Sequence, residues 1–300
     1  MSPRRENHLN LVLHMSIACL FPGQGSQSKG MGAELFDRYP DWTTVADDVL
    51  GYSLRELCLD DPRRELGKTA FTQPALFVVN AMSYRARTDQ GLTPPAFVAG
   101  HSLGEYNALV AAGVFDFANG LRMVRERGAL MGQISGGGMM AVIGLPPAQI
   151  EAVLSQSDAG RRVDVANFNS PEQTVLAGAR EDLAATEPAL KAAGARACIA
   201  LKVSAAFHSR YMHEPMRRFK AFLTNFEFGP PSIPVVANLT GLPYAPDLLH
   251  ETLADQIGHS VRWLDSVRFL LGQGVTDFEE VGPGTVLTKV VAQIRTSAGH

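Results

Sequence analysis

Hydrophobic and polar positions follow two different patterns along this chain. Short apolar runs, typical of buried strands, alternate with longer segments in which apolar residues recur at helical spacing. The expected strands cover 16–21, 96–99, 234–237 and 275–279. The expected helices cover 74–88, 104–112, 117–134, 212–225, 248–257, 262–272 and 285–294. This alternation predicts an α/β fold with a mostly parallel sheet that is covered by helices.

The pattern changes after the glycine cluster Gly136–Gly138, which we expect to break regular structure. Beyond it we expect a strand at 139–143, a helix from 146 onward and two strands at 163–167 and 173–177. A helix at 181–193 and a strand at 195–201 follow. This order is that of a ferredoxin-like unit. Because the two ends of such a unit lie close together, we expect residues 137–203 to be an insert. The larger domain then consists of residues 15–136 and 204–300.

The turn Gly100-His101-Ser102-Leu103-Gly104 connects an expected strand to an expected helix and places a serine at its apex. Only small flanking residues allow a turn so sharp that the serine hydroxyl stands clear of both elements. The helix behind Ser102 directs free N–H groups and the positive end of its dipole at any oxyanion formed there. The alternative is a chance G-x-S-x-G pattern, but the preceding strand and following helix favour a nucleophile.

Two further segments follow expected strands. Phe21-Pro22-Gly23-Gln24-Gly25-Ser26-Gln27 is a glycine-rich loop, whose backbone can approach a ligand closely and donate its N–H groups. His208 comes shortly after the apolar run 197–201. A serine needs a neighbouring base, because its hydroxyl stays protonated at pH 7. Of the 8 histidines only His208 follows a strand end as Ser102 does, so we expect both at the same sheet edge.

These segments recur, in this order, in a known family. The matching residues are Gly23–Gln27, Gly100–Glu105 and Ala206–Ser209, with further matches at 73–76, 127–128, 167–173 and 280–284. On these residues the chain resembles the malonyl-CoA:acyl carrier protein transacylase family over positions 16 to 295. The amino-acid sequences of the second and third segments are most similar to those of the free-standing acyltransferases that serve polyketide synthases in trans. The resemblance implies an α/β-hydrolase-like large subdomain, an inserted ferredoxin-like small subdomain and an active site in the cleft between them.

The resemblance also implies roles for the backbone around Ser102 and His208. The N–H groups of Gln24 and Leu103 would form the oxyanion hole, although Gln24 can equally be a plain turn residue. The backbone carbonyl of Gln256 would orient the histidine, which gives a Ser–His dyad. The chain departs from the family pattern at Ser260, where proline is usual. From the residues alone, the acids that remain open as a third member are Asp255, Asp265 and Asp277.

Arg127 is the main indication of substrate specificity. It lies within an apolar helical stripe formed by Phe117, Leu121, Met123, Val124, Leu130 and Met131. An inward-facing arginine is costly without an anion, which is either a structural partner or a substrate carboxylate held by two parallel hydrogen bonds. The substrate-binding arginine of the family precedes a glycine, as Arg127 precedes Gly128. This match favours a substrate carboxylate.

Gln73 and Phe207 are further candidates for the substrate pocket. The resemblance supports Gln73 as a lining residue. Phe207 directly precedes His208 and is placed either to enclose the acyl group or to pack in the core, and the sequence does not separate these roles.

Composition narrows the classes of partner. The 300 residues are 46% hydrophobic and 19% charged, as in an ordinary globular protein. A net charge of −3 argues against nucleic acid or an acidic membrane as partner. The cysteines Cys19, Cys58 and Cys198 show no metal spacing and fit a cytoplasmic setting, and no apolar run approaches the ~20 residues of a membrane span. We expect residues 1–14 to be a mobile tail.

The function hypothesis is an acyltransferase that moves a malonyl group from malonyl-CoA to the phosphopantetheine thiol of an acyl carrier protein, in polyketide or fatty acid biosynthesis. A coenzyme A thioester, an acyl carrier protein and polyketide synthase modules are the expected partners, with no metal and no tightly bound cofactor. One alternative is an acyl hydrolase that clears acyl carrier proteins, which would gain nothing from a buried arginine. The other is a non-catalytic docking subunit, which would have no need of Ser102 or His208.

Overall fold

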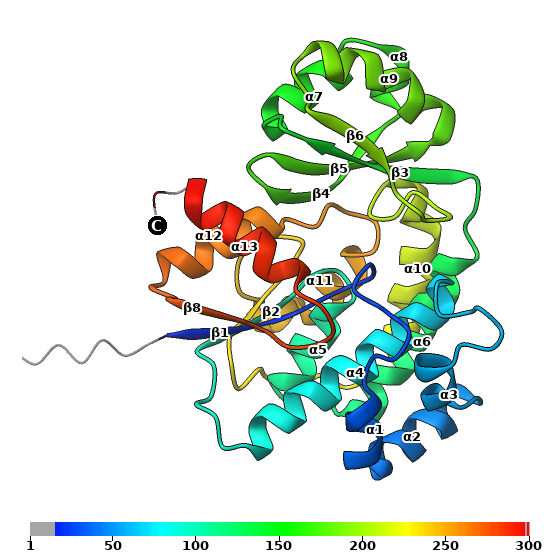
Figure 1. Cartoon of the computed structure of the whole chain (residues 1–300), viewed down its shortest axis with the longest axis vertical. Coiled ribbons are helices and arrows are strands. Elements are labelled where there is room, and N and C mark those ends of the chain that lie inside the picture. Colours follow the sequence, from blue (N-terminus) through cyan, green and yellow to red (C-terminus); the bar gives the residue numbers. More distant parts are fainter. Residues whose placement is uncertain (1–15, 298, 300) are drawn as a thin grey trace, which may run out of the picture.

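The computed structural model describes residues 16–297 and residue 299, which form two units with one sheet each (Figure 1). The expected tail, residues 1–14, lies outside the described residues. The first sheet has four parallel strands in the order β7-β2-β1-β8. They are β1 (Ile17–Phe21), β2 (Phe97–Gly100), β7 (Val235–Val236) and β8 (Asp277–Glu280). The predicted parallel sheet is therefore confirmed.

Helices cover both faces of this sheet because both faces of its central strand are apolar. Cys19 and Phe21 of β1 belong to one hydrophobic core, and Ala18 and Leu20 belong to another. The first core is closed by α4 (Thr69–Asp89), α5 (Gly104–Ala111), α6 (Phe117–Gly132), α10 (His213–Leu223) and α11 (Leu249–Asp255). The second is closed by α12 (Trp263–Gly272) and α13 (Val286–Ser297). Figure 1 shows α12 and α13 on one side of β1 and α4 on the other.

All expected helices of this unit are present, and the differences concern starts and short elements. α4 begins at Thr69 rather than at 74, because Pro74 lies inside the helix instead of in its first turn. The helices α1 (Ala33–Arg38), α2 (Pro40–Leu50) and α3 (Leu54–Leu59) were not predicted. They are too short for a clear periodicity, and tertiary packing of a few buried side chains stabilises them.

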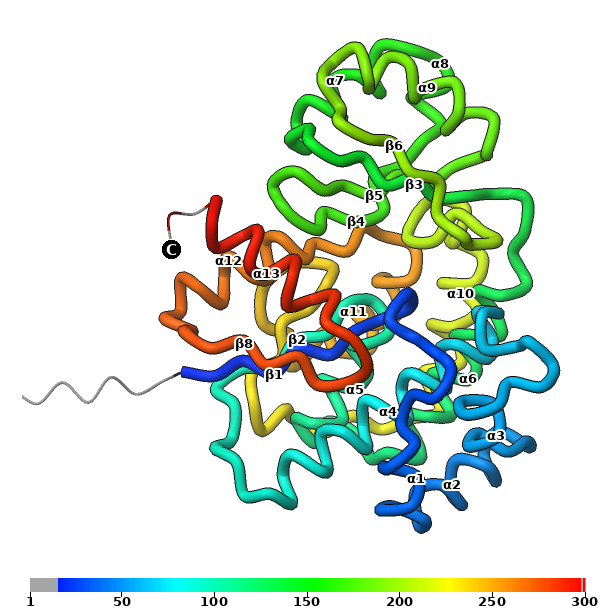
Figure 2. Tube along the Cα trace, in the orientation of Figure 1, coloured from blue at the N-terminus to red at the C-terminus, as the bar shows by residue number. Residues whose placement is uncertain are grey.

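The second sheet is antiparallel, with the order β4-β5-β3-β6. Its elements are β3 (Gly137–Ile143), α7 (Pro147–Ser155), α8 (Asp158–Arg161), β4 (Asp164–Ser170), β5 (Gln173–Ala179), α9 (Arg180–Ala192) and β6 (Ala197–Ala200). Apart from the short α8, this is the predicted order of strands and helices. The first and last strands, β3 and β6, pair with each other, so the chain enters and leaves this unit side by side (Figure 2).

The glycine cluster interrupts regular structure only at Gly136, which lies between α6 and β3 with φ of 86°. Gly137 and Gly138 belong to β3 and pair with Ala179 and Gly178. A Cβ on Gly137 would lie 2.8 Å from the backbone nitrogen of Ala206, so glycine is needed there for the close approach of another backbone segment.

The two units are joined directly at β4. Val261 forms a parallel bridge with Asn167, and its N–H donates to the Ala166 carbonyl at 2.8 Å. Ser260 donates to the Val165 carbonyl at 2.5 Å, so the residue that departs from the family pattern is used in this contact. None of the described helices is long and apolar enough to cross a membrane.

Candidate active site

Ser102 lies in the sharp turn between β2 and α5. Its φ of 52° is in the left-handed region, which is uncommon for a residue other than glycine. A Cβ on Gly100 would lie 1.9 Å from the carbonyl carbon of Gly104, and a Cβ on Gly104 would lie 2.0 Å from the carbonyl oxygen of Phe21. The elbow expected from the glycine spacing is therefore present, and Ser102 lines a cavity.

The His208 ring stands against the Ser102 hydroxyl. Its Nε2 lies 2.7 Å from Ser102 Oγ, and its Nδ1 lies 2.9 Å from the backbone carbonyl oxygen of Gln256. Because a carbonyl oxygen only accepts, Nδ1 carries the proton and Nε2 can accept one from Ser102.

The orienting partner of His208 is thus a carbonyl, and no carboxylate takes its place. The acids left open by the sequence, Asp255, Asp265 and Asp277, do not bond the ring. Burial, followed by the positive charge of Arg127, lowers the pKa of His208 to about 3. The ring is therefore neutral at pH 7, which is the form that accepts a proton.

His208 reaches this position by a route that differs from the expected one. The strand before it, β6, ends at Ala200 and belongs to the antiparallel sheet, whereas Ser102 follows a strand of the parallel sheet. The prediction that both residues end strands of the same sheet is wrong, although the two side chains meet. Residues 201–208 instead cross from the second unit to the first, and the backbone of His208 is also left-handed, with φ of 55°.

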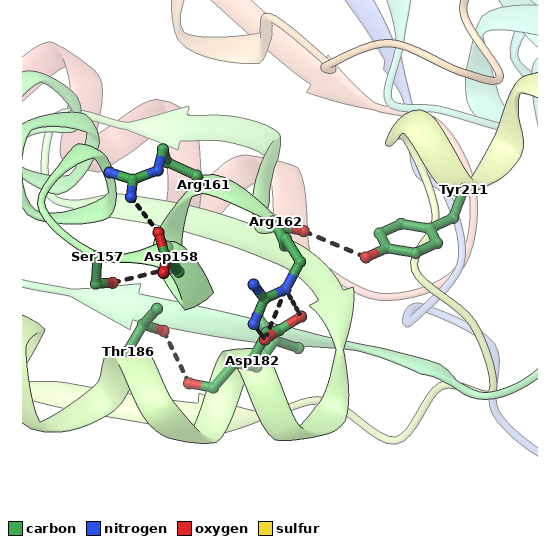
Figure 3. Close-up of polar contacts among 9 residues, drawn as sticks. Ser157, Asp158, Arg161, Arg162, Asp182, Thr186 and Tyr211 are labelled. Carbon is green, nitrogen blue, oxygen red and sulfur yellow. Dashed lines mark hydrogen bonds and ion pairs between the residues drawn. The ribbon is translucent and has the colours of Figure 1, made fainter.

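Polar contacts hold the segment after His208 against the second unit. Arg210 pairs with Asp164, with Nε 2.9 Å from Oδ1. The Tyr211 hydroxyl donates to the carbonyl of Arg162 at 3.3 Å (Figure 3). These contacts anchor the chain to the second unit directly after His208.

Arg127 is fully buried on α6, and its donors converge on the same place. Nη1 donates to Gln73 Oε1 at 2.8 Å, and Nη2 donates to Gln256 Oε1 at 2.9 Å and to Ser102 Oγ at 3.1 Å. Among residues 16–297 no carboxylate lies within ion-pair distance of the guanidinium, and Nε has no hydrogen-bond partner there. The structural ion pair considered for Arg127 is therefore not found in the described part of the chain, and a cation with free donors faces the nucleophile.

The side chain of Gln256 connects Arg127 to a buried carboxylate. Its Nε2 donates to the carbonyl of Ser102 and to Glu105 Oε2, both at 2.7 Å. Glu105 Oε1 accepts from the Tyr244 hydroxyl at 2.5 Å and from the Asn238 N–H at 3.1 Å. Burial raises the pKa of Glu105 to about 7, against the opposing effect of these donors.

Asn238 fixes the elbow from the other side. Its Oδ1 accepts from the Ser102 N–H and its Nδ2 donates to the Gly100 carbonyl, both at 2.7 Å. Sequence reasoning missed Asn238, Tyr244 and the role of Glu105. A signal existed for Asn238 alone, since it directly follows the apolar run 234–237, at the end of a parallel strand where functional groups gather.

The cavity at Ser102 is small, about 110 Å³. It contains all the predicted site residues except Gln256, and its lining consists of Gln24, Gln73, His101, Ser102, Leu103, Arg127, Met131, Met139, Asn167, Leu201, Val203, Phe207 and His208. His101, the neighbour of Ser102, lines the same cavity, with Nε2 2.9 Å from Asn169 Oδ1.

The two expected oxyanion-hole residues, Gln24 and Leu103, both line this cavity. The loop that carries Gln24 packs directly on the elbow, since a Cβ on Gly23 would lie 2.4 Å from the carbonyl oxygen of His101. Within residues 16–297, neither the Gln24 N–H nor the Leu103 N–H donates a hydrogen bond. Two free backbone donors beside a serine are what a developing oxyanion requires.

A second cavity of about 570 Å³ adjoins the first and shares Gln24 and Val203 with it. Lys68, Arg180 and Lys202 line it, and no acidic residue does. Groups of three His, Cys, Asp or Glu side chains placed to hold a metal ion are absent from the described residues.

Comparison with known proteins agrees with this geometry. Residues 19–296 match the acyl transferase domain family. The chain is 50% identical to the polyketide biosynthesis malonyl CoA-acyl carrier protein transacylase BaeC of Bacillus velezensis, covering 93% of this chain and 96% of that protein. It is also 50% identical to the polyketide biosynthesis protein ThaF of Burkholderia thailandensis over 92% of this chain, but it spans only 24% of that longer protein.

Solved structures of malonyl-transacylases match the whole architecture. One, in complex with a type II polyketide synthase acyl-carrier protein, superposes with a TM-score of 0.89 at 39% identity, covering 94% of this chain and 93% of that one. The mixed α/β architecture is therefore shared with malonyl-transacylases.

Proposed function

The chain belongs to the acyl transferase domain family, and on this premise we propose that it transfers a malonyl group from malonyl-CoA to the phosphopantetheine thiol of an acyl carrier protein. The observation that carries the malonyl assignment is Arg127, a buried cation that donates to Ser102 and has no carboxylate partner among the described residues. The proposed setting is polyketide or fatty acid biosynthesis, the pathways of its relatives, and the reaction needs no tightly bound cofactor.

The dyad performs both halves of the reaction. His208 Nε2 takes the proton of Ser102 as Oγ attacks the thioester carbonyl, and the ring returns this proton to the departing coenzyme A sulfur. The malonyl group then forms an ester with Ser102. In the second half His208 takes the proton of the carrier thiol, whose sulfur attacks the ester, and Ser102 recovers its proton.

Backbone donors stabilise the charge that develops in each attack. The oxyanion lies between the N–H groups of Gln24 and Leu103, and the dipole of α5 points its positive end at the same place. The carbonyl of Gln256 holds the Nδ1 proton of His208, so the ring keeps the tautomer that the reaction needs.

Arg127 selects the acyl group. Its charge and free donors fit a carboxylate, which it binds through parallel hydrogen bonds while Gln73 and Gln256 hold the guanidinium in place. Phe207 and Gln73 line the remaining space around the acyl chain. A neutral acyl group would leave this buried cation without an anion.

The adjoining cavity gives the phosphate-bearing arm its entrance. Lys68, Arg180 and Lys202 provide positive charge where the arm leaves the catalytic cavity. Coenzyme A and the prosthetic group of a carrier protein both carry phosphate on this arm, so one entrance serves both substrates in turn.

The proposal includes the domain organisation. Residues 15–136 and 204–300 are an α/β-hydrolase-like subdomain and residues 137–203 a ferredoxin-like insert. The parallel order β7-β2-β1-β8 and the antiparallel order β4-β5-β3-β6 support it. In a cytoplasmic setting, both substrates would be at hand.

Intact-protein mass spectrometry tests the function. Incubation with malonyl-CoA should add one malonyl group, and addition of a carrier protein bearing phosphopantetheine should move that mass to the carrier. If the adduct is instead released as free malonate at the same rate with and without the carrier, the protein is an acyl hydrolase. If no adduct forms and no thioester is consumed, the proposed function is wrong.

A further inference from the structure

Glu105 touches none of the reacting atoms and does not line the catalytic cavity, yet it contacts the groups that hold all of them. It is fully buried on α5, shortly after Ser102. Its three hydrogen-bond partners among residues 16–297 all donate to it: the Asn238 N–H, the Tyr244 hydroxyl and the Gln256 amide. A buried carboxylate surrounded only by donors is a fixed acceptor that an amide cannot replace without conflict.

One arm of this arrangement runs through Asn238. Glu105 accepts a hydrogen bond from the Asn238 backbone N–H at 3.1 Å. The Asn238 side chain in turn bonds the Ser102 N–H and the Gly100 carbonyl. The position of the nucleophile's backbone therefore depends on a residue that Glu105 holds.

The other arm runs through Gln256 and reaches the cation. The Gln256 amide has one end that donates and one that accepts. Its Nε2 faces two acceptors, Glu105 Oε2 and the Ser102 carbonyl, so its Oε1 faces the guanidinium of Arg127. If the amide turned over, its N–H groups would face those of Arg127, donor against donor. The carboxylate therefore selects the orientation of the amide that anchors Arg127.

We infer that Glu105 is a positioning residue that sets malonyl selectivity, by fixing the Gln256 amide in the orientation that holds Arg127 against the acyl group. This inference rests on the proposed function, because it concerns how Arg127 recognises a carboxylate. It goes further in assigning selectivity to a residue that the substrate never contacts.

The test is Glu105→Gln, which keeps the shape and replaces one acceptor by a donor. If the NH₂ group of the new glutamine faces Gln256, it drives the Gln256 amide to turn over. If it faces the other way, it stands opposite the Asn238 N–H, donor against donor. We expect the ratio of malonyl to acetyl loading rates to fall about tenfold, the factor that 1.4 kcal/mol represents, whatever common loss both rates share through Asn238. Both rates are measured from the corresponding CoA esters by mass spectrometry.

Tyr244→Phe is the matched control. It removes a donor from Glu105 Oε1 but leaves the carboxylate and its bond to Gln256 in place. The ratio should stay at the wild-type value even if the protein is less stable. A merely structural role of Glu105 predicts the reverse, in which both variants lower both rates together.

A double-mutant cycle completes the test. In an Arg127→Ala background, Glu105→Gln should leave the ratio unchanged, because its effect passes through Arg127. If Glu105→Gln does not fold, Gln256→Met serves instead, since it removes the amide but keeps the carbonyl that orients His208. An unchanged ratio in the folded single variant, or an equal drop in the Arg127→Ala background, overturns the inference. A wild type that loads no malonyl contradicts the proposed function instead.

Discussion

The two units contribute different kinds of side chain to the catalytic cavity. The parallel-sheet unit supplies the polar groups, Ser102, Arg127 and His208, together with the buried Glu105 and Gln256 that hold them. The unit proposed as the insert contributes Met139, Asn167, Leu201 and Val203, of which only one is polar. One side therefore carries the hydrogen-bonded network around Ser102, while the other adds mainly apolar surface to the cavity.

This division has a consequence for specificity. A change in the network disturbs several groups at once, because Glu105 Oε1, Gln256 Nε2 and Arg127 Nη2 each bond two partners. A change on the insert side alters only volume and contact. Substitutions on the two sides should consequently differ in kind as well as in size.

Ser102→Ala should have the largest effect, complete loss of the malonyl adduct. The variant removes the only atom to which the acyl group bonds in the proposed mechanism, while a small hydroxyl in a turn contributes little to stability. Intact mass after incubation with malonyl-CoA measures the adduct, and circular dichroism checks the fold. An adduct of undiminished yield would show that the nucleophile lies elsewhere.

His208→Ala should slow both acylation and transfer to the carrier by roughly 10²–10⁴-fold, the usual effect of losing a positioned base. His259→Ala is the control, since the His259 ring lies near His213 and 2.7 Å from the Asp255 carbonyl oxygen, and does not line the catalytic cavity. Single-turnover rates with malonyl-CoA separate the two half-reactions. Equal rates for the two variants would rule out His208 as the base.

Arg127→Ala should change substrate choice more than chemistry. It leaves a malonyl carboxylate desolvated and unpaired, at a cost of about 2–5 kcal/mol, whereas an acetyl group loses nothing comparable. The ratio of malonyl to acetyl loading should therefore fall at least about tenfold. Arg122→Ala, on the exposed side of the same helix, should leave the ratio unchanged. If both substrates lose activity equally, Arg127 is structural.

The buried base should also appear in the pH dependence of stability. The pKa of His208 is about 3 in the folded protein and about 6.5 when unfolded, so below pH 6.5 only the unfolded state takes up this proton. Between pH 7 and pH 5 the wild type should lose about 2 kcal/mol of unfolding free energy relative to His208→Gln, at 1.36 kcal/mol per unit. Urea unfolding of both proteins at the two pH values measures it. If the unfolding free energies of the two proteins change equally between pH 7 and pH 5, His208 is not a neutral, buried base.

Leu201→Ala on the insert side should have the smallest effect. It widens the cavity without touching the network, so methylmalonyl loading should rise about fourfold relative to malonyl loading, the factor that about 0.8 kcal/mol per buried methyl group represents. Ile199→Ala is the control, because Ile199 lies on the same segment but is 52% exposed and does not line the cavity. A fall in both rates of the size seen for the network variants would show that the insert also positions the chemistry.

The sequence by itself determined the features that depend on near neighbours in the chain. Gly100, Ser102 and Gly104 predict the elbow because a sharp turn is a local steric requirement, and the structure has it. The apolar stripe on α6 placed Arg127 inward because helical periodicity is local as well. The parallel sheet and the order of elements in the insert followed from the same periodicities.

Other features were decided only by tertiary structure. The position of His208 after an apolar run identified it as the base but predicted the wrong sheet for the preceding strand. The sequence pattern does not show which sheet a strand joins. Helices α1 to α3 are stabilised by packing that no short window shows.

The hydrogen-bond network around the dyad was the feature that the sequence predicted least. Glu105 bonds Asn238 and Tyr244 across 133 and 139 positions of the chain, and Gln256 across 151. No local pattern around these residues indicates which partners they take. Only folding removes them from water and brings each donor opposite an acceptor, and that pairing fixes where the nucleophile, the base and the cation meet.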